Sequence, residues 1–403
     1  MTTIVSRCRL SAAVGGLAVS LLDGGNAFAQ DRWTLVPDVK YAADTAALLT
    51  EVQHFAVDGR GSSYVVDIRE DAILMYDTAG IYQATIGRRG WGPGEFRIIG
   101  TIGLHQDMLW AWDQALQRIT FFDPAGRLIR ETPTPQIVDA RANRRYRIHS
   151  LLVDGSFLMT EAVDFTTYTR LAASGYPLLK LSPDGEALDT LGQLAIRNAL
   201  MLIETPRGGL VQVRQPWHHS DILAVSRAGD RIVLVERPAA TSTRDGRYRI
   251  KVMDGKASVL FGRTINDEAL PLTDAHVEQW LSAFTPGLVR SGTFPSASSA
   301  RSAVREHLYV PEFPPAIPNS GRGLSNTGAV LAGLDGMIWI LRTSDSTGQQ
   351  WDVVDPVGVR VASIRSPAGV IVSEVSREFA WGVELDPDDV PWLVRYRIRR
   401  LRR

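Results

Sequence analysis

Short apolar runs separated by turn residues recur along most of this chain. Residues 54–86 contain four such runs, with Asp and Gly at the turns between them, and residues 99–130 repeat the same order. Apolar runs joined by Asp-Gly or Gly-rich turns are typical of β-hairpins, because both residues tolerate the conformations that tight turns need. Each copy therefore predicts four short antiparallel strands.

Later copies are less regular but keep the order of strand and turn. They occupy residues 151–191, 222–261 and 330–364, and residues 379–398 leave room for only about three strands. We expect residues 33–36 to supply the missing strand, since pairing the two ends of the chain removes exposed sheet edges. The repeat predicts an all-β fold, a six-bladed β-propeller with four-stranded antiparallel blades and a ring closed by the N-terminal strand.

One segment, about residues 265–326, interrupts the β pattern between the fourth and fifth copies. Apolar residues with helical spacing follow Asp274, and Pro286 predicts the end of that helix. Residues 290–326 are rich in Ser, Pro and Gly and predict a long loop. The interpretation is one domain, residues 30–403, with a single helical and proline-rich insert.

The first 29 residues have the features of a signal peptide. Arg7 and Arg9 precede the apolar residues 10–22, and Ala27 and Ala29 supply the small residues that signal peptidase accepts. Cleavage before Gln30 removes Cys8, which is the only cysteine of the chain. We expect a periplasmic or secreted protein without disulfides and without a membrane span after cleavage.

Composition adds limits on the partners. The chain has 44 Lys and Arg residues against 44 Asp and Glu residues, so no net charge attracts nucleic acid. Apolar residues make up 45%, which is enough for a sizeable core. We expect a monomer that binds no nucleic acid.

A glycine-rich stretch between the first two copies makes the resemblance to a known class specific. Residues 87–96 end in Gly92-Pro93-Gly94-Glu95-Phe96, and a similar stretch links successive blades in NHL-repeat propellers. The whole chain resembles uncharacterised six-bladed propeller proteins exported by environmental bacteria. This resemblance implies the fold and no particular activity, because related propellers include metal-dependent hydrolases, lyases and binding modules.

Histidines are the first candidates for chemistry. His54, His105 and His149 lie near the first strands of three copies, and His218 and His219 precede that of the fourth. Imidazoles that converge on a central channel could bind zinc, and oxygen ligands could bind calcium. The registers of these histidines differ, however, so scattered loop histidines remain the alternative.

Carboxylates follow the second strand of three copies, at Asp67, Asp113 and Glu161. They could ligate calcium, or they could cap turns and pair with neighbouring arginines. No Gly-x-Ser-x-Gly motif and no phosphate-binding glycine loop is present, so covalent catalysis has no support.

Linker residues are the candidates for ligand binding. Trp91 and Trp217 lie between copies, and Arg88, Arg89 and His218 accompany them. Our first hypothesis is a non-catalytic scaffold that binds a protein, peptide or glycan outside the cytoplasm and needs no cofactor. The alternative is a metal-dependent hydrolase or lyase, with Zn or Ca held by His54, His105, His149 and His219 at the mouth of the channel.

Overall fold

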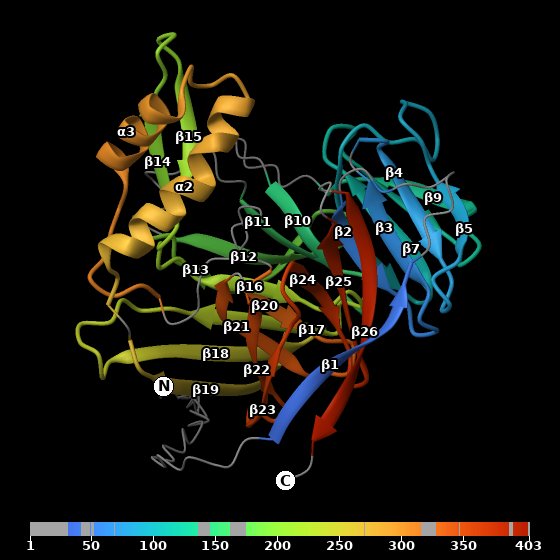
Figure 1. Ribbon diagram of the computed structural model, residues 1–403. Coiled ribbons are helices and arrows are strands. Elements are labelled where there is room, and N and C mark those ends of the chain that lie inside the picture. Colours follow the sequence, from blue (N-terminus) through green and yellow to red (C-terminus); the bar gives the residue numbers. More distant parts are fainter. Residues whose placement is uncertain are drawn as a thin grey trace, which may run out of the picture.

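The computed structural model describes residues 31–41, 49, 52–67, 69–135, 146–161, 175–269, 271–315, 328–345, 347–386 and 390–401. The predicted signal peptide lies outside this part of the chain, as do residues 162–174. Within it the fold is a propeller-like arrangement of antiparallel sheets with two helices (Figure 1). Neither described helix is long and apolar enough to cross a membrane.

The first two repeats form two separate four-stranded antiparallel sheets, as predicted. The first sheet contains β2 (Val52–Val57), β3 (Ser63–Asp67), β4 (Ala72–Tyr76) and β5 (Tyr82–Ile86). The second sheet contains β6 (Ile99–His105), β7 (Met108–Asp113), β8 (Arg118–Phe122) and β9 (Leu128–Pro133).

Two further four-stranded antiparallel sheets follow. The third contains β10 (Tyr146–Leu151), β11 (Phe157–Glu161), β12 (Tyr176–Leu181) and β13 (Ala187–Leu194). The fourth contains β16 (Ile222–Val225), β17 (Arg231–Glu236), β18 (Gly246–Asp254) and β19 (Val259–Asp267).

The remaining repeats share one eight-stranded sheet. Its first half contains β20 (Val330–Ala332), β21 (Ile338–Asp345), β22 (Gly348–Val354) and β23 (Arg360–Arg365). Its second half contains β24 (Val370–Val375), β25 (Phe379–Leu385), β26 (Pro391–Leu401) and β1 (Asp31–Lys40). A parallel pairing of β1 with β23 joins the halves.

The predicted pairing of the two chain ends is present. Trp33 lies opposite Arg400, and Val36 lies opposite Arg397, in an antiparallel pairing of β1 with β26. Trp33 is buried, and the guanidinium of Arg400 lies 4.7 Å from the centre of its ring. The N-terminal strand thus completes the last repeat.

The link between the first two sheets is fixed as its motif predicts. Phe96 is fully buried between these sheets, and the guanidinium of Arg118 donates to the carbonyl oxygen of Glu95 at 2.7 Å. Gly87 has a φ of +74°, and an added Cβ there would lie 2.4 Å from the Phe96 ring. Glycine is therefore required where the chain crosses from β5 to β6.

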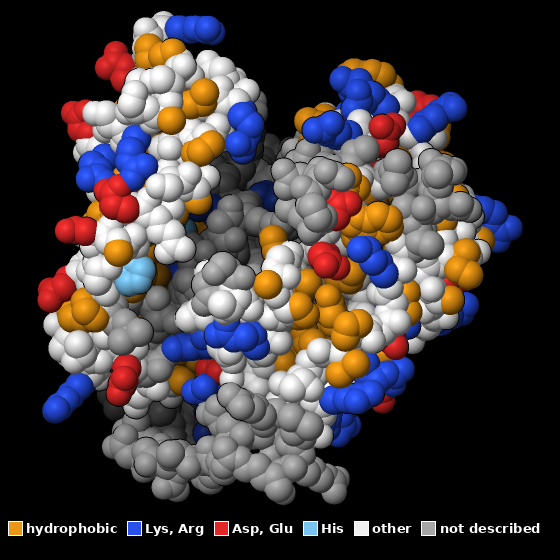
Figure 2. All heavy atoms as spheres, viewed as in Figure 1, with side chains coloured by type: hydrophobic (Ala, Val, Ile, Leu, Met, Phe, Trp, Pro, Cys, Tyr) orange, Lys and Arg blue, Asp and Glu red, His pale blue; other side chains and the backbone are white. Residues whose placement is uncertain are grey.

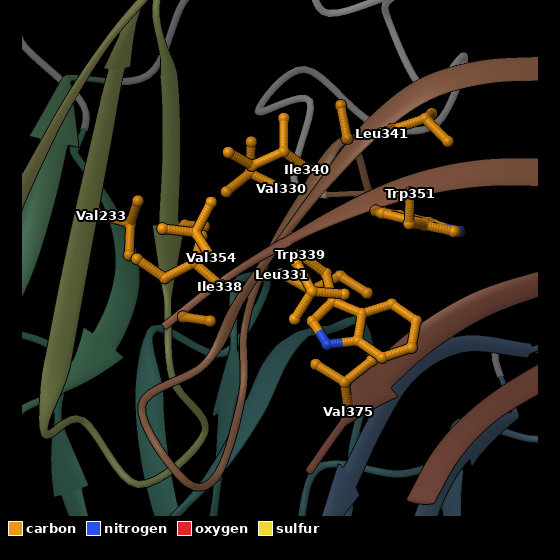
Figure 3. Close-up of a cluster of buried hydrophobic side chains, with 14 of the residues drawn as sticks. Val233, Val330, Leu331, Ile338, Trp339, Ile340, Leu341, Trp351, Val354 and Val375 are labelled. Carbon is orange, nitrogen blue, oxygen red and sulfur yellow. The ribbon is translucent and has the colours of Figure 1, made fainter. Parts of the chain in front are cut away.

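Apolar clusters between neighbouring sheets form the core. One cluster joins the fourth sheet to both halves of the eight-stranded sheet, and Figure 3 shows its side chains from Val233 of β17 to Val375 of β24. Another joins the last repeat back to the first sheet, because Trp381 packs with Phe55 and Tyr76. Trp110, Trp339 and Trp351 are buried in these clusters.

The interruption between repeats is larger than predicted. A two-stranded hairpin, β14 (Leu200–Glu204) and β15 (Leu210–Arg214), lies in the chain between the third and fourth sheets. It was not predicted from the sequence. The predicted helix is present as α2 (Asp274–Arg290), but it continues through Pro286. Part of the predicted loop is a second helix, α3 (Ala297–His307).

The hairpin and both helices pack together, and we call them the insert module. Met201, Ile203 and Val213 from the hairpin share one apolar cluster with Leu281 of α2 and Val304 of α3. Leu288 and Val289 also pack against this cluster, which explains why α2 continues past its proline. The module therefore has its own small core, at the upper left of Figure 1.

The first strands of the sheets surround a common axis. β2 contacts β6 and β24, β6 contacts β10, and β20 contacts β16 and β24. The C-terminal ends of these strands meet, since Leu104 N donates to Arg227 O at 2.8 Å and Leu334 N donates to Val375 O at 3.0 Å. We call this side the closed end and the opposite side, where the first strands begin, the mouth.

A turn at residues 226–230 covers the closed end. The guanidinium of Arg227 lies 3.2 Å from a carboxylate oxygen of Glu374, which belongs to the last repeat. Gly229 O accepts from Val153 N at 3.2 Å in the third sheet. The turn thus bridges the second, third and last repeats across the axis.

Removal of β1 should destabilise the protein. A chain that begins at residue 41 loses the burial of Trp33 and both pairings of β1, which we expect to cost at least about 3 kcal/mol and roughly 6 °C in Tm. Thermal unfolding followed by circular dichroism measures this, with the chain that begins at residue 30 as control. An unchanged Tm would contradict this role of β1.

Substitution of Gly229 should loosen the closed end. Its φ is +68°, and an added Cβ would lie 2.1 Å from Leu151 O, so Gly229→Ala should cost at least about 2 kcal/mol of unfolding free energy. Gly208 is a matched control, because its φ is +77° and no atom lies within 4 Å of the added Cβ. Gly208→Ala should cost about 1 kcal/mol. Equal costs, measured by urea unfolding, would show that the turn does not pack closely.

Candidate functional site

The mouth is the candidate functional site, because the insert module and several partly buried polar side chains meet there. Figure 2 shows the molecule hollowed between the module and the sheets of β2–β9, with Lys or Arg side chains visible inside the hollow. The start of β10 contributes Arg147 and His149, and the start of β12 contributes Tyr176. These three side chains are neither fully buried nor exposed.

β10 positions Arg147 and His149 on the same side of the third sheet. Ile148 between them points into the apolar cluster with Trp110, so its two neighbours must point away from that cluster. A bulge between Ile148 and Ser150 shifts the register next to His149, whose Nε2 lies 2.7 Å from Thr160 Oγ1. Bulges often redirect a side chain next to a functional site.

Arg147 is the central charge of the mouth. Among the described residues it forms no ion pair and no hydrogen bond. Burial lowers the pKa of its guanidinium, and its charge in turn lowers the pKa values of His149 and Arg214. In the part of the chain that the structure describes, no carboxylate therefore balances this positive charge.

Arg214 extends this positive charge from the insert module. Val213 faces the helices, so its neighbour Arg214 points to the other side of the hairpin, toward the third sheet. Burial and the nearby Arg147 lower the pKa of Arg214 to about 10. Burial raises the pKa of Tyr176 to about 12; the carboxylate of Asp221 adds to this rise, whereas Arg214 and Arg147 oppose it. The phenol is therefore a neutral hydrogen-bond donor beside two guanidinium groups.

A polar network behind Arg214 connects the module to the fourth sheet. Arg237 is fully buried, and its Nε donates to Ser220 O at 2.8 Å. Burial lowers the pKa of Arg237 to about 9, whereas Asp221 opposes that shift. Asp221 accepts from Ala195 N at 2.8 Å and lies 3.5 Å from the guanidinium of Arg197. This network holds the chain at the base of the hairpin.

The predicted binding residues are divided between the rim and the module. Trp91 is 72% exposed, with the guanidinium of Arg97 5.1 Å from the centre of its ring. Arg88 pairs with Glu95 at 2.8 Å, and Arg89 pairs with Asp71 at 2.7 Å.

Trp217 is not an exposed linker side chain. Its ring packs against Trp280 of α2 at a centroid distance of 6.1 Å, so it helps to hold the module together. His218 is buried, and Ser220 N donates to its Nδ1 at 3.3 Å. The structure therefore places these two candidates inside the base of the module.

The candidate metal ligands are spread over several sheets. Burial lowers the pKa values of His54 and His149; Arg227 and Arg147 add to the shift at His54, and Arg147 adds to it at His149. His105 lies at the end of β6 toward the closed end. His219 is buried with both ring nitrogens unbonded in the part of the chain that the structure covers. No group of three His, Cys, Asp or Glu side chains that could hold a metal occurs among the described residues.

Two of the carboxylates considered as calcium ligands cap turns instead. Asp67 Oδ1 accepts from Arg69 N at 3.0 Å. Asp113 accepts from Arg97 N at 2.6 Å and from Ala115 N at 2.9 Å. These contacts agree with the alternative role of the two carboxylates, which is to cap turns.

The arginines of the mouth were not among the residues predicted from the sequence. Arg147, Arg214 and Arg237 lie far apart in the chain, and no short motif connects them. A signal did exist for Arg147, which alternates with His149 on either side of an apolar residue just before the predicted third copy. Without the position of the hairpin, nothing linked that strand to Arg214.

No known protein family and no curated protein matches the sequence. Among solved structures, the chain is similar to a member of the DUF4221 family from Bacteroides vulgatus, with 9% identity, 92% of this chain and 100% of the other covered, and a TM-score of 0.49. It is also similar to the PQQ-bound aldose sugar dehydrogenase of Streptomyces coelicolor, with 12% identity, 92% and 99% covered, and a TM-score of 0.43.

A third similar structure is the virginiamycin B lyase of Staphylococcus aureus, with 10% identity, 91% and 99% covered, and a TM-score of 0.39. These TM-scores are below 0.5, so the description of the fold rests on the sheets of the chain itself. The similarities carry no argument about its function.

The histidine of the mouth should make stability depend on pH. Burial lowers the pKa of His149 from 6.5 to about 3, so the folded protein keeps it neutral while the unfolded chain takes up a proton below pH 6.5. The contribution of neutral His149 to the unfolding free energy is thus fully present above pH 6.5 and is lost as the pH falls toward 3.

His149→Gln keeps an amide donor for Thr160 but does not titrate. The variant should lose about 1 to 2 kcal/mol less unfolding free energy than the wild type between about pH 7 and about pH 5. Urea unfolding at both pH values measures this, with the exposed His276→Gln as control. Parallel losses in the wild type and His149→Gln would contradict burial of a neutral imidazole.

Proposed function

We propose that residues 30–403 form a single exported six-bladed β-propeller of the NHL-like type. In this proposal it is a non-catalytic scaffold that binds a protein, peptide or glycan at its mouth. The blades are the four separate sheets and the two halves of the eight-stranded sheet, with β1 as the outermost strand of the last blade. The glycine-rich link at Phe96 and the predicted signal peptide support the type and the export.

One observation carries the proposal. The insert module extends the fold at the mouth, whereas a turn covers the opposite end. The hairpin and α2 with α3 both interrupt the chain just before a first strand begins, so both stand at the mouth. The turn at residues 226–230 covers the other end through Arg227 and Gly229. Elaborated loops on a rigid scaffold are where binding sites commonly lie.

A metal-dependent hydrolase or lyase is the less favoured alternative. Two of the candidate ligands, His54 and His149, lie where positive charge opposes a cation, since Arg227 and Arg147 both lower the pKa of His54 and Arg147 lowers that of His149. A cation bound between them would be repelled by that charge. Positive charge at the mouth therefore favours binding of a ligand over binding of a metal.

A bulky label at the mouth should abolish binding. The chain from residue 30 contains no cysteine, so His149→Cys gives one reactive site at the mouth and Val357→Cys gives one on the far turn between β22 and β23, where Val357 is 62% exposed. Each variant is coupled to a maleimide-linked polymer and applied to an array of defined peptides and oligosaccharides. We expect the label at residue 357 to leave binding intact and the label at residue 149 to remove it.

Two results would contradict the proposal. The unlabelled protein could bind no member of the array, or both labelled proteins could bind equally well. The thermal unfolding curve of each labelled variant shows whether a loss of binding reflects a loss of fold.

A further inference from the structure

We infer that the mouth binds the oxyanion of its ligand, a carboxylate or a phosphate group, through Arg147 with Arg214 beside it. This inference rests on the proposed binding function and adds the chemical class of the ligand. Guanidinium groups present a planar set of N–H donors that matches carboxylate and phosphate oxygens.

Arg147 differs from several other arginines that are partly withdrawn from solvent. The chain balances each of these with a carboxylate. Examples are Arg118 with Glu131 at 3.2 Å, Arg227 with Glu374 at 3.2 Å and Arg395 with Asp38 at 2.6 Å. In the described part of the chain, no carboxylate lies within ion-pair distance of Arg147.

Further positive charges lie near Arg147. Arg214 acts on it from the module, and Arg237 and Arg197 lie behind Arg214. Asp221 is the carboxylate that acts on Arg237, and it is also engaged with Ala195 N and Arg197. An anion bound at Arg147 would reduce the repulsion between its guanidinium and that of Arg214.

A neutral donor completes the site. The Tyr176 hydroxyl stays protonated at neutral pH and can donate to an anion. Among the described residues no carboxylate pairs with Arg147, so a donor beside this guanidinium favours an anionic ligand over a cationic one.

Three hexose probes of similar size test the inference, namely D-glucuronate, D-glucose 6-phosphate and D-glucose. Isothermal titration calorimetry on the chain from residue 30 should detect binding of at least one of the two anions and none of glucose. The anion that binds more tightly shows whether the site prefers a carboxylate or a phosphate group. Added salt should weaken the binding, because the attraction is electrostatic.

Variants assign the binding to Arg147. We expect Arg147→Gln to weaken binding of the preferred anion by about tenfold or more, and Arg147→Lys to recover part of it. Arg127→Gln is the matched control, since Arg127 is exposed and pairs with Asp123 on a distant turn. Arg147→Gln should not lower Tm, because it removes an unbalanced charge; a structural arginine would lower it on removal.

Three results would overturn the inference: no binding of either anion at millimolar concentration, equal binding of glucose, or no effect of Arg147→Gln. Binding by the protein labelled at residue 149 shows whether only this inference fails or the proposed function fails as well. If that label abolishes binding of a neutral array member while the anions do not bind, the mouth remains the binding site and only the inference about charge is wrong.

Discussion

The structure depends on one constraint, which is that each four-stranded sheet has two apolar faces to bury. A sheet in the middle of such a set can bury both faces only against neighbouring sheets. The clusters between consecutive sheets meet this need, and the packing of Trp381 against Phe55 extends it from the last repeat to the first. The pairing of β1 with β26 then ties the chain ends into the same arrangement.

This constraint also decides where chemistry can occur. Sheet faces are used for packing, so polar and charged groups collect where the first strands begin or end. At one end, Arg227 and Glu374 neutralise each other under a turn. Burial raises the pKa of Glu374 to about 7, although Arg227 opposes that shift. At the other end Arg147 has no such partner among the described residues, and this contrast between the two ends is the basis for inferring an anionic ligand at the mouth.

Much of the fold could be predicted from the sequence, because its signals are local. Asp-Gly turns such as Asp254-Gly255 mark hairpins directly, and the link that ends in Phe96 marks a crossing between sheets. The hairpin β14–β15 was missed because its strands are short and lie outside the repeat. Helix α3 was missed because a Ser-rich sequence has weak helical preference, and its helical form depends on packing of Ala300 and Val304 in the module.

The site could not be predicted in the same way, since it depends on residues brought together by the ring. Trp217 looked like an exposed linker residue, yet it packs on a helix that begins more than fifty positions later. Arg147 and Arg214 become neighbours only because the hairpin stands beside the third sheet. Pairwise proximity of this kind leaves no spacing pattern in the sequence.

A crystal structure of the protein grown with D-glucuronate or D-glucose 6-phosphate would test the central claim most directly. The account predicts density for the anion at the mouth, with its oxygens within hydrogen-bond distance of the Arg147 guanidinium. An Arg147 paired with a carboxylate of the protein itself, in a mouth without ligand density, would contradict it.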